Sequence, residues 1–254
     1  MRMAIRSALL AFVLLLAVGH NGAAAADLKV LTAGAMRGVL EALLPQFERD
    51  LGHRVVVDSA TAGGLGKRIE GGEAFDVAII TPSVIDELSN KGKIGSPRVD
   101  LAKVGMGVAV KAGTAAPDIA TVEAFKQALI AAKSVAYIDP AAGGSSGIYF
   151  DQLIERLGIG DEVRAKARLK RGGYVADLVA SGEAELAVHQ ISEIVPVKGV
   201  TLVGPLPAPV QNFTVYTAAV GAASREPDAA KALVDHLAGP AALPVLQAKG
   251  MERP

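Results

Sequence analysis

The chain has 254 residues, with 26 basic and 26 acidic side chains, no cysteine and no tryptophan. Balanced charge argues against a nucleic-acid or anionic-membrane partner, since either would call for clustered basic residues. Few aromatic residues argue against a stacking platform for sugars or bases. Without cysteine, the chain forms no disulfide and carries no cysteine-linked lipid anchor.

The N-terminus is typical of a secretory signal peptide. Arg2 and Arg6 precede an apolar run from Ala8 to Val18, and alanines at 24–26 give small residues at the expected cleavage site. The run is too short to cross a bilayer as a helix. We expect residues 1–26 to be removed, leaving 24 basic against 26 acidic side chains because two arginines are lost and no acid precedes Asp27. The mature protein is expected in the periplasm, not embedded in the membrane, and as a monomer.

Next come three strand–turn–helix units. Apolar strands are predicted at residues 28–31, 55–57 and 76–80, and helix-period segments at 36–47, 65–70 and from 82 onward. Strands that are apolar on both faces favour a parallel sheet covered by helices on both sides. In such sheets ligands bind at the carboxyl ends of the strands, where the small-residue turns lie.

The second half repeats this pattern after a long alternating strand at residues 103–111. Helices are predicted at 121–131 and 175–179, strands at 135–138 and 185–188, a crossing strand at 213–220, and tail helices at 227–237 and 241–248. We therefore predict an α/β fold of two lobes, each a mostly parallel sheet flanked by helices, with two crossing strands as a hinge. Residues 27–104 with 210–254 would form one lobe and residues 105–209 the other.

The turn from Asp139 to Gly147 is rich in glycine and serine and leads from a strand into a helix. Such a turn leaves backbone N–H groups free, and the helix dipole adds positive potential there, which favours an anion. We predict that this turn and two first-lobe turns surround one small anion. The residues expected to contact it are Gly34, Ala35, Met36, Ala62, Gly63, Gly64, Ser145, Ser146 and Gly147.

Two other motif readings are disfavoured. Residues 143–147 match the Gly-x-Ser-x-Gly pattern of serine hydrolases, but four residues separate them from the preceding strand. Residues 61–68 have the composition of a phosphate loop without its spacing.

Further candidates lie near the predicted cleft. Gln190 follows a strand end, and Arg171 is placed to pair with a carboxylate. Tyr149 is either helix core or a hydroxyl above the ligand. His189 is either structural or a group that contacts the ligand and transfers a proton. No histidine has a partner at metal-ligand spacing, so neither a metal nor another cofactor is expected.

Residues 30–47, 58–80 and 139–158 resemble periplasmic solute-binding proteins of type II, the molybdate-binding kind. The resemblance spans essentially the whole mature chain. It implies a two-lobed fold that holds a small anion with turn hydroxyls and backbone N–H groups and delivers it to an ABC permease. Here Ala35 stands where that family has a serine.

A second resemblance, to the aconitate isomerase branch of the same fold, runs through residues 99–109, 117–137, 146–149 and 181–205. It implies an enzyme that interconverts cis- and trans-aconitate by proton transfer in the cleft, with His189 as the candidate base. Two hypotheses follow: a binding protein for a small organic di- or tricarboxylate or an oxyanion, and an isomerase.

Overall fold

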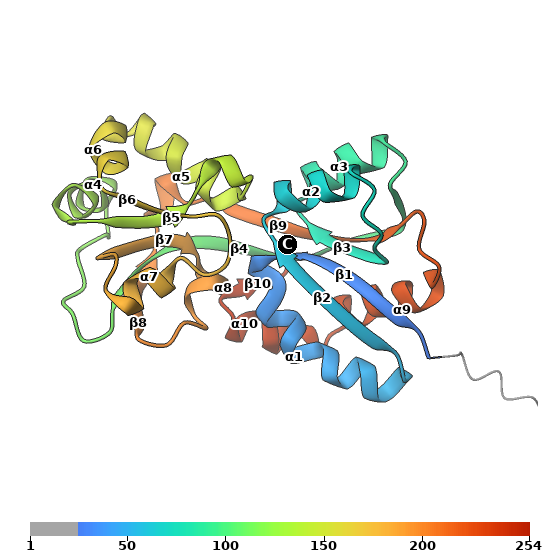
Figure 1. The fold of residues 1–254 in the computed structure, drawn as a ribbon. Helices are drawn as coiled ribbons and strands as arrows, with labels where there is room; N and C mark the ends of the chain where they lie inside the picture. Colours follow the sequence, from blue (N-terminus) through green and yellow to red (C-terminus); the bar gives the residue numbers. More distant parts are fainter. Residues whose placement is uncertain (1–24) are drawn as a thin grey trace, which may run out of the picture.

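The computed structural model describes residues 25–254, so most of the expected signal peptide lies outside the described residues. The strands form one mixed sheet in the order β2-β1-β3-β9-β4-β7-β5-β6, with β8 and β10 also paired to β4. Two groups of helices cover it on either side of the central strand β4 (Figure 1). The predicted α/β fold with two lobes is confirmed.

The first lobe contains a parallel set of three strands. β1 (Asp27–Ala33) pairs in parallel with β2 (Arg54–Ala60) and with β3 (Val77–Ile80), and β9 (Phe213–Gly221) runs antiparallel to β3. Each parallel strand is followed by a helix, as the sequence predicts. These helices are α1 (Gly34–Leu51), α2 (Ala62–Glu70) and α3 (Pro82–Asn90), and α9 (Pro227–Ala238) and α10 (Ala242–Ala248) complete the lobe.

The second lobe repeats this arrangement. β5 (Val135–Ile138) pairs in parallel with β6 (Ala167–Lys170) and β7 (Leu186–Gln190). The lobe also contains β8 (Val200–Pro205), which the sequence did not predict as a strand. Its helices are α4 (Val122–Ala131), α5 (Ser145–Arg156), α6 (Gly160–Ala165), α7 (Ala176–Ser181) and α8 (Ile191–Ile194).

The strand β4 (Ile94–Lys111) belongs to both lobes. Between Ile94 and Gly105 it pairs with β9, and from Met106 to Val110 it pairs with β7. It begins nine residues earlier than the predicted strand at 103–111, and in this added part the exposed Arg98 and Asp100 alternate with Val99 and Leu101. The short strand β10 (Met251–Glu252) pairs with the edge of β4 opposite to β9.

The core is divided in the same way. Buried apolar side chains of β1, α1, β9 and α9 pack together in the first lobe, with Phe47 and Leu40 fully enclosed. A separate cluster in the second lobe contains Phe125, Tyr137 and Phe150, and the rings of Tyr137 and Phe150 meet edge to face at 4.9 Å. Each lobe therefore has its own core, so turns at the lobes' facing edges can form a site between them.

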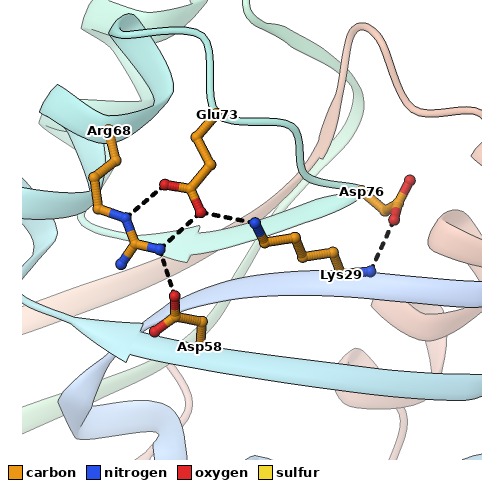
Figure 2. A network of polar contacts seen from close by, with 5 residues as sticks. All are labelled: Lys29, Asp58, Arg68, Glu73 and Asp76. Carbon is orange, nitrogen blue, oxygen red and sulfur yellow. Dashed lines mark hydrogen bonds and ion pairs between the residues drawn. The ribbon is translucent and has the colours of Figure 1, made fainter.

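A network of charged side chains joins the last turn of α2 to the sheet (Figure 2). Arg68 donates to Glu73 and Asp58, and Lys29 Nζ donates to Glu73 at 2.7 Å. Arg68 and then Lys29 hold the pKa of Glu73 at about 2, well below its usual range. Arg68 thus stabilises the position of α2, whose first turn faces the cavity described next.

Candidate functional site

A cavity of about 170 Å³ lies where the turns of the two lobes meet. It is smaller than the roughly 300–1,000 Å³ typical of drug-sized ligand sites, which suits a small anion. Turns at the carboxyl ends of β1, β2, β5, β6 and β7 contribute to its wall, as expected for parallel strands. The lining residues used below are Gly34, Arg37, Thr61, Ala62, Ser145, Ser146, Lys170, Tyr174, Asp177, His189, Gln190, Glu193 and Tyr216.

The first turns of three helices face this cavity. α1 begins at Gly34 and α5 at Ser145, and neither has a side-chain cap. α2 begins at Ala62 and is capped by Thr61, whose hydroxyl accepts from Gly64 N at 3.1 Å. Uncapped first turns present free N–H groups and the positive end of the helix dipole. The arrangement favours a negatively charged ligand.

Six of the predicted site residues line the cavity: Gly34, Ala62, Ser145, Ser146, His189 and Gln190. Ala35 and Met36 lie in the first turn of α1, but their side chains are buried in the first-lobe core. They could therefore contact a ligand through their backbone groups alone. These residues come from both lobes, as the sequence-based hypothesis requires.

Gly63 and Gly64 lie in the first turn of α2, directly after the lining residues Thr61 and Ala62. Gly63 N donates to Gly143 O at 3.0 Å, and the hydroxyl of Thr61 donates to Ala142 O. A Cβ added to Gly63 would lie 3.0 Å from Gly143 O and 3.1 Å from Gly143 Cα, so the two glycines allow the backbones of the lobes to touch. The predicted first-lobe and second-lobe turns are therefore in direct contact.

Three other predicted residues lie outside the lining. The Tyr149 hydroxyl donates to Val210 O at 2.8 Å, and Arg171 is largely exposed and pairs with Asp139 at 3.3 Å. Gly147 is buried against the end of β5, where its Cα approaches Ile138 O closely. Lys170, the last residue of β6, lines the cavity instead, whereas Arg171 lies one residue beyond the strand.

A hydrogen-bonded chain crosses the floor of the cavity. The buried Tyr216 hydroxyl donates to Gln190 Oε1 at 2.7 Å, and Gln190 Nε2 donates to Ser145 Oγ at 3.3 Å. Burial raises the pKa of Tyr216, so its hydroxyl keeps its proton and acts as a donor. The chain links β9 of the first lobe to β7 and α5 of the second and holds the Ser145 hydroxyl at the cavity wall.

His189 and Glu193 form a buried pair at the same wall. Their side chains are 1% and 8% exposed, and His189 Nε2 lies 3.5 Å from Glu193 Oε2. Burial, and then the charge of Lys170, lowers the pKa of His189 to about 3, and burial raises the pKa of Glu193 to about 8. At neutral pH both side chains are therefore uncharged.

Two cations border the cavity. Arg37 pairs with Glu41 at 2.8 Å on the outer side of α1, and Lys170 Nζ lies 2.9 Å from both Asp177 Oδ2 and Tyr174 O. With Asp177 as the one ionised acid of the lining in the described chain, the wall carries a net positive charge at neutral pH. The lining thus combines free N–H groups, hydroxyls and positive charge.

The sequence analysis did not predict Glu193, Lys170 or Tyr216 as site residues. Glu193 was signalled only by its position four residues after His189, just past a strand end. Tyr216 lies in the middle of β9 and reaches the cavity solely through the packing of the two lobes. No local pattern marks it.

Among residues 25–254, no three histidine, acidic or cysteine side chains are grouped so that they could hold a metal ion. Within the same range, no helix has both the length and the apolar character required to span a bilayer.

Known proteins are similar in sequence to this chain over most of its length. An aconitate isomerase of Pseudomonas sp is 34% identical over 234 residues, which cover 89% of this chain and 87% of that protein. The molybdate-binding protein ModA of Azotobacter vinelandii is 28% identical over 243 residues, 90% of each.

Solved structures show the same fold. The periplasmic molybdate-binding protein of Azotobacter vinelandii superimposes with a TM-score of 0.76 at 24% identity, over 89% of this chain and 99% of that one. The sulfate-binding protein SubI of Mycobacterium tuberculosis gives a TM-score of 0.72 at 15% identity, over 90% and 87% of the two chains. The resemblance to solute-binding proteins of the molybdate-binding kind is thus confirmed. A family model described as "Bacterial extracellular solute-binding protein" matches residues 28–252, and the chain belongs to that family.

Proposed function

We propose that the protein binds a small organic di- or tricarboxylate between its lobes. The observation that carries this proposal is that the first turns of α1, α2 and α5 face one cavity, which is also bordered by Arg37 and Lys170. Backbone N–H groups hold one carboxylate, and cations on two sides of the cavity suit a ligand with more than one negative group.

A carboxylate is favoured over a tetrahedral oxyanion by two observations. Ala35 stands where the molybdate-binding kind has a serine, so the first turn lacks that hydroxyl. The aconitate isomerase relative, named for a tricarboxylate, is more similar in sequence than the molybdate-binding relative.

The protein would act in the periplasm and pass its ligand to an ABC permease. The family description as extracellular supports this location, and one structural neighbour is described as the substrate-binding domain of a putative molybdenum ABC transporter. We propose that the lobes comprise residues 27–104 with 210–254 and residues 105–209, and that they close by bending at the strands between them.

A thermal-shift screen tests ligand binding. At a concentration one hundred times Kd, trans-aconitate, citrate or tricarballylate is expected to stabilise the fold by about 2.7 kcal/mol, which raises Tm by about 5–10 °C. Arg37→Gln should weaken binding about tenfold, a modest loss because the side chain is half exposed. Arg49→Gln, in the same helix and away from the cavity, is the matched control. The proposal fails if no carboxylate stabilises the protein, or if only molybdate or sulfate does.

One observation favours a second candidate, an aconitate isomerase. His189 is part of the cavity wall and unprotonated at neutral pH; a bound tricarboxylate beside it favours the imidazolium and raises its pKa from the low value of the ligand-free site, so it could remove a proton from one carbon of aconitate. The C–H bond breaks, its electron pair shifts into the conjugated carboxylate system, and the imidazolium returns the proton at the other carbon.

Incubation of the purified protein with trans-aconitate tests this candidate. The cis isomer should appear in the proton NMR spectrum with wild-type protein and be absent with His189→Gln, while His53→Gln, remote from the cavity, keeps the activity. Binding without any cis isomer would leave the protein a transport component alone, and turnover by His189→Gln would remove His189 as the base.

A further inference from the structure

Glu193 places a carboxyl group in the wall of a cavity that otherwise favours an anion, which is unusual. Its Oε2 lies 3.5 Å from His189, and a Cβ added to Gly34 would lie only 2.5 Å from its Oε1. The carboxyl group therefore packs against the first residue of α1, whose N–H groups carry no side-chain cap. It lies beside the position that an anion bound at that helix start would take.

No cation neutralises this carboxyl group. Among the described residues, no lysine or arginine nitrogen lies within 4.0 Å of it, and the neighbouring His189 is held neutral by burial. A buried carboxylate without a partner is costly, so the group keeps its proton well into the neutral range, and its pKa is about 8.

The other titratable groups around the cavity do not change this conclusion. Among the described residues, the titratable side chains that line the cavity from β9, β6 and the turn before α7 form no ion pair with the carboxyl group, and β8 carries no titratable residue. None of the charged residues of β4 lines the cavity. Among the described residues, the titratable side chains that line the cavity with Glu193 are Arg37, Lys170, Tyr174, Asp177, His189 and Tyr216.

We infer that Glu193 is a specificity-determining residue that carries a proton when the anion binds and donates it to a ligand carboxylate oxygen. The inference rests on the proposed function, because it requires a carboxylate in this cavity. Once ionised, Glu193 would itself be the anion at the start of α1 and would repel the ligand. Binding is therefore coupled to the proton on Glu193.

The sign of this coupling follows from linkage. A bound anion makes ionisation of Glu193 harder, so the bound protein holds the proton more tightly than the free protein. Full affinity is present below the pKa of the free protein, about 8, and is lost as the pH rises above it. The protonated fraction falls about tenfold between pH 7 and pH 9, and the Kd for trans-aconitate should rise about tenfold.

Isothermal titration calorimetry with trans-aconitate and with citrate at pH 7 and pH 9 tests the inference. Wild-type protein and the exposed-surface control Glu87→Gln should both lose about tenfold in affinity. Glu193→Gln, which keeps a neutral donor, should change less than twofold. In parallel, the Glu193 carboxyl carbon, assigned by its absence in Glu193→Gln, is followed by ¹³C NMR in the ligand-free protein.

The outcomes separate the two proposals. A carboxyl resonance that titrates near pH 4.5, or a carboxylate that binds equally well at pH 7 and pH 9, overturns the role of Glu193 and leaves the proposed function intact. Failure of every carboxylate to bind overturns the proposed function and this inference with it. A titration near pH 8 together with the tenfold loss supports both.

Discussion

Gly147→Ala is expected to lower the free energy of unfolding by about 3 kcal/mol, at the upper end of the range for overpacked interiors. The new Cβ would lie 2.2 Å from Ile138 O and 2.9 Å from the carbonyl carbon of Ile138. Both are backbone atoms at the end of β5, and Gly147 is buried, so neither side can yield. The substitution forces the start of α5 away from the strand.

Urea unfolding measures this effect. Gly38→Ala in α1 is the matched control, because its Cβ would meet nothing closer than Lys249 Cε at 3.6 Å. Alanine is the better helix former, so this variant should be as stable as the wild type or up to about 1 kcal/mol more stable. Equal midpoints for the two variants would contradict the packing described for the start of α5.

The second large effect concerns pH and the pair His189–Glu193. Glu193 has a folded pKa of about 8 against 4.5 when unfolded, so its protonated form contributes stability that is full below pH 4.5 and lost as the pH rises to 8. His189 has a folded pKa of about 3 against 6.5, so stability is lost as the pH falls from 6.5 to 3. Between pH 4.5 and 6.5 the two effects cancel.

Wild-type protein should therefore lose about 2 kcal/mol between pH 6.5 and pH 8.5, at about 1.4 kcal/mol per pH unit until the pKa of Glu193 is passed. Glu193→Gln has no carboxyl group to ionise, so its stability should stay level over that interval. Urea midpoints at the two pH values give the comparison, with Glu87→Gln behaving like the wild type. A parallel decline in Glu193→Gln would show that another group is responsible.

Elements with a local signature were predictable from the sequence. The strand at 135–138 was predicted with the bounds that the structure gives it, since four apolar residues stand between polar turns. The three helix starts were marked by small residues after strands, and they face the same cavity. β8 was not predicted, because Gly204 and Pro205 at its end read as the start of a connector.

The candidate site was harder to predict because lobe packing places much of it. The sequence could point to Ser145 and Ser146 in a conspicuous turn, but not to Tyr216, which comes from a distant strand. Arg171 had the right chemistry, yet it lies one residue past the end of β6 and pairs with Asp139, whereas Lys170 lines the cavity. Which side chain faces a site depends on the course of the backbone, and amino-acid composition alone does not specify that course.

Beside the cavity, the two lobes meet through main-chain atoms of Gly63 and Gly143. A contact made of main-chain atoms does not depend on the side chains of the cavity lining, so substitutions in that lining can alter the preferred ligand while the contact between the lobes is kept. A change of ligand on this scaffold therefore requires substitutions in the cavity lining and none in the contact between the lobes.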